Sequence, residues 1–498
     1  LPVTLAMGLL RAYGDETLEK LKDNPYLLTD ERCGVDFSAA DEIALAMGFD
    51  GDSPCRTEAA VLYELNHNLS NGHVFLPRPK LLAATMELIG VDGEAVEKAL
   101  DDLCERGAIV CRPIANVQGC YLRRMYEAEV YVAKRLAAAC GDDWDCGKNV
   151  DRIIDDIQKQ QGVAYAPEQR RAVALAAERG ILLLTGGPGT GKTTSVRGIV
   201  TLFERMGLDV LLLAPTGRAA QRMSQLCGRD AQTVHRALGM SWNELTGEVT
   251  FRKNEKEPLE ADAVIVDEMS MVDLELMASL LRAMRPGCRL VMVGDPDQLP
   301  SVGAGNVLGD LLRSGVIPSV SLTEIFRQAE KSAIIRNAHA VNTGRPPELK
   351  NTQNDFFFLC RRAPDRLVQT VVAGIFNGDV GVIQEIDPSG ELITIQFDDR
   401  TCVYTADLLN QLDMAYAMTV HKAQGSEYRC VVLVSAAVAP ALMVRGVLYT
   451  AITRARELLV LGGDDVAPGQ MAANDRQQRR YSGLRRRLRE EAANHGME

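Results

Sequence analysis

The chain has 498 residues, of which 46% are hydrophobic and 24% are charged, and its formal net charge is −12. This length exceeds one ordinary hydrophobic core, so we expect two to four domains, and the composition excludes a disordered chain. The net charge argues only weakly against nucleic-acid binding, because such binding depends on a local basic groove rather than on the sum of charges.

The sequence indicates neither a membrane segment nor a disulfide framework. No stretch reaches the roughly 18 apolar residues of a spanning helix, and the first residues lack a basic leader with a cleavage site, so we expect a cytoplasmic protein without membrane contact. The 12 cysteines contain no CxxC pair and are expected to be reduced thiols without zinc. Because the chain opens at Leu1, inside an apolar periodic pattern, we expect that an N-terminal part precedes it.

The first third of the chain is predicted to be mostly helical. Residues 1–52 contain two short helical hairpins. Residues 53–115 contain three amphipathic helices and then an apolar strand, which is the order of a winged-helix unit, and residues 116–164 are expected to be linker helices. Both units could contact DNA or could be plain packing units, and the pattern alone favours neither.

Two α/β domains are predicted after these helices. The runs "GILLLTG", "VLLLAPT", "AVIVDE" and "RLVMVGD" alternate with helical segments and predict a parallel sheet covered by helices over residues 165–320. The runs "RCVVLVSAA" and "ELLVLGG" predict a second such domain over residues 321–374 and 413–498. Its C-terminal stretch "DRQQRRYSGLRRRLREE" is expected to be a basic helix with a solvated face.

A small β domain is predicted inside the second α/β domain. Residues 375–412 alternate between apolar and polar side chains and carry turn signals such as Asn377-Gly378. This pattern predicts a small antiparallel barrel.

A glycine-rich segment between a strand and a helix fits the phosphate-binding pattern GxxxxGK[ST] from Gly186 to Thr193. Glycines let backbone N–H groups converge on phosphates, Lys192 supplies a positive charge, and Thr193 supplies a hydroxyl to Mg²⁺. The residues expected to bind the nucleotide here are Gly187, Pro188, Gly189, Thr190, Gly191, Lys192, Thr193 and Thr194.

Other polar residues at strand ends complete a predicted hydrolytic site. Asp267 can hold Mg²⁺ together with Thr193, and the adjacent Glu268 can orient the attacking water. Gln298 can sense the γ-phosphate. Arginines such as Arg327 and Arg454 can stabilise the transition state, although the residues alone favour plain surface charges at both positions.

Taken in order, these segments resemble the motif series of superfamily 1 helicases, in the RecD-like branch of DNA helicases. "TVHKAQGSE" is the most diagnostic string, because a generic ATPase has no reason to repeat it. The other matching segments are "AYAPEQRRAV", "LLLAPTGRAAQRM", "TVHRALG", "VIVDEMS", "VGDPDQLPSVGAGNVL", "LTEIFRQ" and "VLYTAITRAR".

The resemblance implies a role for each matching residue. It assigns Gln169 to the adenine base, Glu427 to the nucleotide site, and Arg327 and Arg454 to the role of arginine fingers. The residues implied to contact DNA are Thr216, Arg218, Thr233, His235, Asn306, Thr419 and His421.

The resemblance also implies an architecture and an activity. It implies two RecA-like motor domains, tandem helix-hairpin-helix segments, a winged-helix unit and an SH3-like insertion. It further implies a monomer that couples Mg-ATP hydrolysis to 5′ to 3′ movement on single-stranded DNA, acts at single-strand/duplex junctions, and has repair or recombination partners.

Two departures from the family pattern and two alternative functions stay open at this stage. "GVDF" replaces a typical GxG turn, and the stretch around residues 361–375 is shorter than in the family, through either a deletion or omitted residues. The alternatives are an ATP-switched DNA-binding or remodelling protein that does not unwind, and the motor subunit of a nuclease complex.

Overall fold

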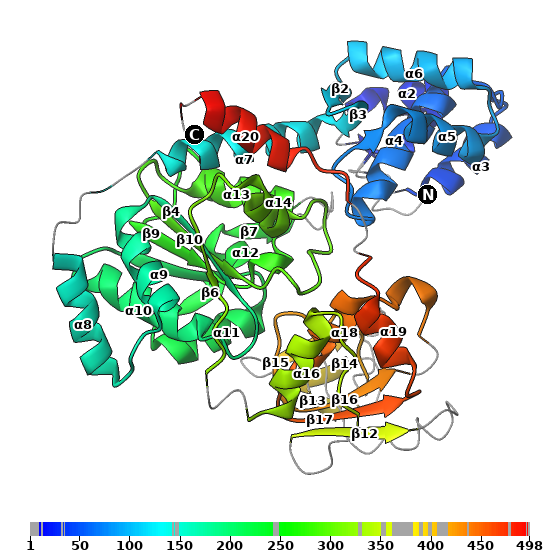
Figure 1. Ribbon diagram of the computed structural model, residues 1–498. Helices are drawn as coiled ribbons and strands as arrows, with labels where there is room; N and C mark the ends of the chain where they lie inside the picture. Colours follow the sequence, from blue (N-terminus) through cyan, green and yellow to red (C-terminus); the bar gives the residue numbers. More distant parts are fainter. Residues whose placement is uncertain are drawn as a thin grey trace.

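The computed structural model comprises an N-terminal helical part and two α/β lobes (Figure 1). It describes residues 9–10, 13–30, 33, 35–141, 144, 149–242, 249–326, 331–349, 355–360, 382–387, 392–396, 401–405, 417–435, 438–476, 480–494 and 496. Within this part of the chain, no helix is both long enough and apolar enough to cross a membrane.

The N-terminal part joins a small helical unit to three helices and a three-stranded antiparallel sheet of order β1-β3-β2. Its elements are η1 (Gly14–Glu16), α2 (Thr17–Asp23), η2 (Pro25–Thr29), α3 (Phe37–Ala46), α4 (Pro54–Ser70), β1 (Leu76–Pro77), α5 (Arg78–Ile89), α6 (Gly93–Glu105), β2 (Ile109–Ile114) and β3 (Val117–Leu122). Ile109 in β2 lies opposite Leu122 in β3. The boundary predicted at residue 115 therefore falls inside a paired hairpin, and residues 117–122 are a strand rather than part of a linker helix.

The first lobe has the predicted parallel sheet, with strand order β11-β4-β10-β9-β5-β6. All strand pairs within this six-stranded sheet are parallel. The elements of the lobe and of the helices before it are α7 (Arg123–Cys140), α8 (Val150–Gln161), α9 (Pro167–Glu178), β4 (Ile181–Gly186), α10 (Lys192–Arg205), β5 (Val210–Ala214), α11 (Gly217–Cys227), β6 (Ala231–Thr233), α12 (Val234–Ala237), β7 (Met240–Trp242), β8 (Val249–Phe251), β9 (Ala263–Val266), η4 (Met269–Met271), α13 (Leu274–Ala283), β10 (Arg289–Gly294), α14 (Val307–Ser314) and β11 (Ser319–Leu322).

The four apolar runs predicted as strands are β4, β5, β9 and β10, so the α/β prediction is confirmed for this lobe. Every residue of β4, β9 and β10 is buried, because helices cover both faces of a parallel sheet. The edge strand β11 ends at Leu322, two residues beyond the boundary predicted at 320.

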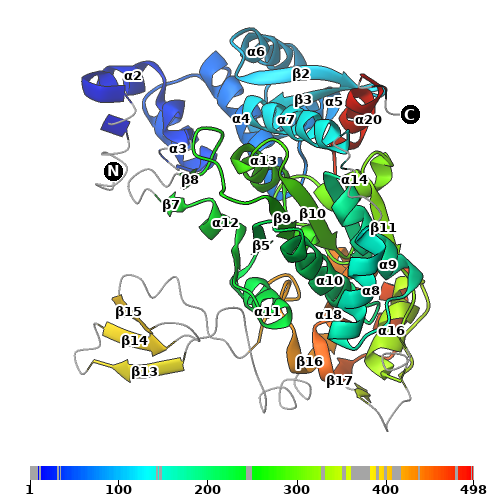
Figure 2. The same ribbon diagram turned by 90° about the vertical axis from the view of Figure 1, so that its left-hand side faces the viewer.

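The second lobe contains a smaller parallel sheet of order β12-β17-β16. A separate antiparallel sheet of order β13-β14-β15 lies to one side of the lobes (Figure 2). This pairing agrees with the alternation in the sequence, while closure into an SH3-like barrel stays a prediction. The remaining elements are α16 (Ala333–Asn342), β12 (Phe356–Cys360), β13 (Val382–Ile386), β14 (Leu392–Gln396), β15 (Thr401–Thr405), β16 (Tyr428–Ser435), η6 (Pro440–Leu442), α18 (Arg445–Ile452), β17 (Ala455–Gly463), α19 (Ala467–Ala473) and α20 (Leu484–Asn494).

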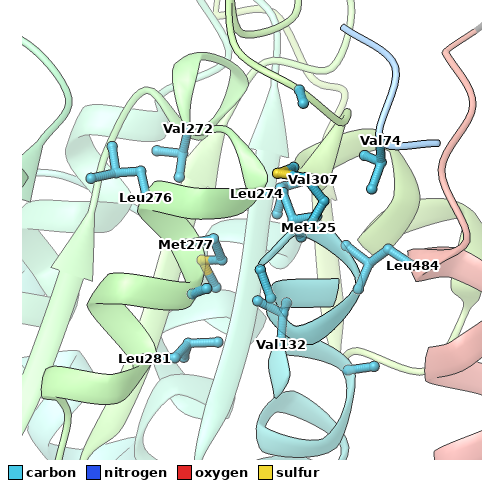
Figure 3. Packing of buried hydrophobic residues seen from close by; sticks show 14 of the residues in the cluster. Val74, Met125, Val132, Val272, Leu274, Leu276, Met277, Leu281, Val307 and Leu484 are labelled. Carbon is cyan, nitrogen blue, oxygen red and sulfur yellow. The ribbon is translucent and has the colours of Figure 1, made fainter. Parts of the chain in front are cut away.

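The C-terminal helix α20 returns to the first lobe and lies beside α7 (Figure 1). Figure 3 shows Leu484 of α20 packed near Met125 and Val132 of α7 and Val307 of α14. One face of this helix is therefore buried against the first lobe, while the opposite face, which carries Arg486, is exposed as predicted. The assignment of residues 413–498 to the second α/β domain is wrong for residues 480–494.

A buried ion pair anchors α20. The Glu129 side chain is fully buried, and its Oε1 lies 2.7 Å from Nε of Arg487. The backbone N–H of Gly483 donates to Glu129 Oε2 at 2.8 Å. Burial raises the pKa of Glu129, and the charge of Arg487 opposes that rise.

Replacing Arg487 by Ala is expected to lower the free energy of unfolding by about 3–5 kcal/mol, because Glu129 would remain buried without its partner. Without the guanidinium, the folded-state pKa of Glu129 rises further above its ordinary value of 4.5. The deficit should therefore be largest at neutral pH and should shrink as the pH falls below the raised pKa of the folded variant, because protonation of Glu129 then removes the unpaired buried charge. Urea unfolding of both proteins at several pH values measures this.

Arg486→Ala is the matched control, because Arg486 pairs with Glu490 on the exposed face of the same helix. We expect that control to change stability by less than about 0.5 kcal/mol. Equal losses in the two variants, or a deficit in Arg487→Ala that does not vary with pH, would contradict this account.

Candidate functional site

A pocket of about 410 Å³ lies between the two lobes. The first lobe supplies the β4–α10 turn and the segments that follow β9 and β10, and the second lobe supplies parts of α16 and the segments that precede β16 and begin β17. Predicted site residues that line this pocket are Gly187, Pro188, Gly189, Gly191, Lys192, Thr193, Asp267, Glu268, Gln298, Glu427 and Arg454. Residues far apart in the sequence therefore meet here.

The β4–α10 turn has the backbone form of a phosphate cradle. Gly189 and Gly191 have φ angles of 76° and 80°, in the left-handed region that favours glycine. A side chain at position 191 would also collide with Gln169, because its Cβ would lie 2.3 Å from Gln169 Nε2. Lys192 opens α10 and donates its ammonium protons to the carbonyls of Gly186 and Gly187. The free N–H groups at the start of α10 suit an anion.

Two carboxylates lie at the end of β9. Removal from water raises the pKa of Asp267 to about 6, and the neighbouring Glu268 adds to the rise, while Lys192 and Arg222 oppose it. Glu268 has a left-handed φ of 53°, which is costly for a residue with a side chain. A half-buried pair of acids beside a phosphate cradle fits a divalent cation, and Thr193 lines the same pocket.

The second lobe brings Arg454 to the pocket. Its side chain is only 3% exposed. Its guanidinium donates to Thr450 O at 3.0 Å, to Ser426 O at 3.0 Å and to Thr453 Oγ1 at 3.1 Å. These bonds fix the guanidinium within its own lobe. The other predicted arginine, Arg327, lies outside the described residues.

Three predicted nucleotide residues do not line the pocket. Gln169 is buried, accepts from Ala166 N at 3.0 Å and donates to Gly191 O at 3.1 Å, so it braces the phosphate turn from behind. Thr190 is also buried, and its hydroxyl donates to Gly187 O at 2.9 Å. Thr194 follows Thr193 in α10 and is half-buried.

Several cross-lobe contacts beside the pocket have no counterpart in the prediction. The Tyr449 hydroxyl donates to the buried Asp295 carboxylate at 2.8 Å. The His339 ring nitrogen Nε2 lies 3.2 Å from Pro188 O. Arg222 forms an ion pair of 2.7 Å with Glu427. Tyr449 lies inside the matching segment "VLYTAITRAR", so the family resemblance could have marked it as a site residue. The sequence around His339 contains no such motif.

The residues predicted to contact DNA lie at several helix starts. Thr216, Thr233 and Asn306 cap α11, α12 and α14 with their side-chain oxygens. Arg218 reaches across to the second lobe and donates to the Tyr428 hydroxyl at 3.1 Å. DNA contact by these side chains stays a prediction.

The other three residues predicted to contact DNA are divided between the lobes, with His235 in the first and Thr419 and His421 in the second. The His235 ring lies 6.1 Å from that of Phe251. Thr419 accepts from Lys422 N at 3.3 Å. His421 and Asn306 line one large cleft of about 1270 Å³. Burial, followed by the charge of Arg480, lowers the pKa of His421.

Three family models match the chain. Residues 1–75 match the ATP-dependent RecD2 DNA helicase HHH domain, residues 164–357 match an AAA domain, and residues 414–461 match the UvrD-like helicase C-terminal domain. The chain is 30% identical to the ATP-dependent RecD2 DNA helicase of Deinococcus radiodurans, over 98% of this chain and 76% of that protein. The chain belongs to this RecD2 helicase family.

The chain also resembles a subunit of a different enzyme and, weakly, a solved helicase structure. The RecBCD enzyme subunit RecD of Mycolicibacterium smegmatis is 31% identical, over 68% of this chain and 77% of that protein. The crystal structure of Pif1 helicase from Candida albicans has 18% identity and a TM-score of 0.35, covering 61% of this chain and 97% of that chain, which is too weak a similarity to bear on function.

Family membership confirms the resemblance to RecD-like helicases. The AAA-domain match at residues 164–357 contains the phosphate turn and both carboxylates. The UvrD-like match at residues 414–461 contains Glu427 and Arg454. In this RecD2-family chain the phosphate turn and the carboxylates lie in one matched region and Glu427 and Arg454 in another, while α16 of the second wall falls inside the AAA-domain match.

Proposed function

We propose that the chain is an ATP-dependent DNA helicase that hydrolyses ATP between its two lobes and moves 5′ to 3′ along single-stranded DNA. The observation that carries this proposal is the shared pocket. One wall supplies Lys192, Asp267 and Glu268, and the other supplies Glu427 and Arg454. The direction of movement is inferred from the family resemblance.

The residues of the pocket fit a magnesium ion. Asp267 and Thr193 are the oxygen donors that would hold it. Burial, followed by the charge of Glu268, raises the pKa of Asp267, and a cation bound beside both carboxylates would offset that rise. Bound Mg²⁺ supplies positive charge to the phosphate oxygens.

Each side chain in the pocket has a distinct task in this proposal. Lys192 exchanges its bonds to the loop carbonyls for bonds to phosphate oxygens. Glu268 orients the attacking water, and Arg454 places positive charge against the transferred phosphoryl group. Gln298 has a buried side-chain oxygen, Oε1, that finds no hydrogen-bond partner among the described residues. This oxygen can accept a hydrogen bond from the attacking water, while the amide Nε2 is the atom that can donate to the γ-phosphate.

Cross-lobe contacts give hydrolysis a route to movement. Leu299, next to Gln298, donates its N–H to Thr450 Oγ1 at 2.9 Å and accepts from Gln424 Nε2 at 2.8 Å. A change at the γ-phosphate is therefore passed directly to two residues of the second lobe. Alternating grip of the two lobes on a single strand would convert this into travel.

Single-stranded DNA is the proposed track, bound mainly through its phosphates, with little recognition of base sequence and a strong dependence of affinity on salt.

As further proposals from the family, the enzyme works as a cytoplasmic monomer with repair or recombination proteins as partners. The similarity to RecBCD subunits keeps a motor subunit of a nuclease complex as the second candidate. The match of residues 1–75 to the RecD2 domain favours the first.

Strand displacement from tailed duplexes tests the proposal. We expect ATP-dependent release of the strand from a duplex with a 5′ single-stranded tail, and little release from a duplex with a 3′ tail. Hydrolysis stimulated by DNA without strand release would instead favour an ATP-switched clamp. Absence of DNA-stimulated hydrolysis would contradict both functions, and release from the 3′-tailed duplex alone would contradict the direction.

A further inference from the structure

The loop between Gln298 and Asn306 connects the two clefts of the molecule. Gln298 lines both the nucleotide pocket and the larger cleft, and Asn306 lines the larger cleft and caps α14. Ser301 and Ala304 within this loop are buried, whereas Val302 is 70% exposed. The loop is therefore held firmly from one side.

Arg480 supplies that hold. Its Nη1 donates to Gly305 O at 2.6 Å, to Gly303 O at 3.0 Å and to Ser301 Oγ at 3.3 Å. Its Nη2 donates to Ser301 O at 2.6 Å. One planar guanidinium thus binds the carbonyls of Ser301, Gly303 and Gly305 together, which a lysine ammonium on a flexible stem could not match in geometry.

The segment that carries Arg480 also ties the loop to the N-terminal part. Tyr481 donates its N–H to His73 Nδ1 at 3.1 Å and accepts from Val74 N at 2.7 Å. The N–H of Gly305 donates to Gly72 O at 3.0 Å. The loop therefore lies between the C-terminal segment and residues 72–74.

We propose that Arg480 is a positioning residue that fixes the loop between Gln298 and Asn306, so that a change at the nucleotide pocket reaches the DNA side and the N-terminal part together. This inference rests on the proposed helicase function and identifies a residue outside the helicase motifs on which its coupling depends. The four bonds that Arg480 donates through Nη1 and Nη2 all go to oxygens of this loop, which assigns it to the loop rather than to the nucleotide pocket. Leu299, the neighbour of Gln298, is gripped by the second lobe, so the two ends of the loop respond to different parts of the protein.

A simpler role for Arg480 would be to fasten the C-terminus to the first lobe. Arg489 provides a matched control for that role, because it donates to Ser314 O and Arg313 O at 2.9 Å each, and both of these acceptors lie outside the loop. Both arginines bind main-chain carbonyls of the first lobe from the same C-terminal segment. Only Arg480 holds the loop.

The test compares the full chain with Arg480→Ala, Arg480→Lys and Arg489→Ala. We expect both Arg480 variants to lower the DNA-stimulated kcat for ATP by about 10-fold, with the KM for ATP changed less than about twofold, and to consume more ATP for each strand released. Arg489→Ala should keep the wild-type kcat and the wild-type ratio of ATP to released strands. Thermal unfolding of each variant accompanies the kinetics.

Three results would overturn the inference. One is a folded Arg480→Ala protein with wild-type kcat and coupling. The second is an Arg480→Lys protein that behaves as wild type, since charge rather than the forked geometry would then suffice. The third is an Arg489→Ala protein with the same kinetic loss as Arg480→Ala. If Arg480→Ala does not fold, Arg480→Lys alone decides the outcome. Failure of the wild-type chain to show DNA-stimulated hydrolysis would instead refute the proposed function.

Discussion

Replacing Lys192 by Ala is expected to lower ATP turnover by about 10³-fold or more, because the phosphate turn would lose its only positive side chain. The contacts of the Lys192 ammonium are the carbonyls of Gly186 and Gly187, both in the turn itself. Its loss should therefore change the stability of the fold very little. Steady-state ATP hydrolysis with saturating single-stranded DNA measures the effect.

Lys159→Ala is a suitable control for this experiment, because Lys159 lies on an exposed helix face and its side chain is 78% exposed. That variant should hydrolyse ATP at the wild-type rate. A folded Lys192→Ala protein with near-normal turnover would remove the phosphate turn from the mechanism.

The elements that could be predicted are those whose signal is local. The strand β4 reads as an uninterrupted apolar run, since both of its faces are covered, and the glycine turn follows it directly. The carboxylates at the end of β9 were predictable for the same reason, because parallel strands end at one edge of a sheet. Strand, turn and helix are adjacent in the chain, so no distant partner is needed to recognise them.

The end of the N-terminal sheet could not be placed correctly from the sequence. The turn between β2 and β3 contains Ala115 with a left-handed φ of 51°. Alanine rarely adopts this conformation, and hairpin turns of this kind are usually signalled by glycine or asparagine followed by glycine. The two-residue loop offers Asn116 but no glycine, which is a weaker turn signal than asparagine followed by glycine.

The packing of the C-terminal helix against the first lobe could not be predicted for a different reason. Its arginines look solvated in the sequence, because the acid that pairs with Arg487 is Glu129, which is 358 residues away. The contacts of Arg480 and Tyr481 are equally remote. A charge pattern alone cannot distinguish a solvated arginine from one paired with a distant buried group.

The same limit applies to the nucleotide pocket. The family motifs bring the residues of each wall to notice, yet His339 and Tyr449 act across the boundary between lobes and depend on how the lobes pack. Gln169 is the opposite case, because a family motif marks it although it does not line the pocket. The resemblance assigns it to the adenine base, whereas its amide hydrogen-bonds the helix start at Ala166 and the phosphate turn at Gly191.

The central claim is that a group from the second lobe completes the hydrolytic site of the first, and Arg454→Ala tests it most directly. We expect kcat for ATP to fall by about 10³-fold while the affinity for ATP stays within about threefold, since the guanidinium acts on the transition state more than on bound ATP. Because Arg454 also holds the carbonyls of Thr450 and Ser426, the thermal stability of the variant must be measured alongside.

Arg456→Ala is the matched control, because Arg456 lines the same pocket two residues further along the chain, but its side chain is 63% exposed and lies 3.8 Å from Glu427. The account predicts a large loss of kcat in a folded Arg454→Ala protein and a small one in Arg456→Ala. A folded Arg454→Ala protein that hydrolyses ATP within about threefold of the wild-type rate would contradict catalysis between the lobes.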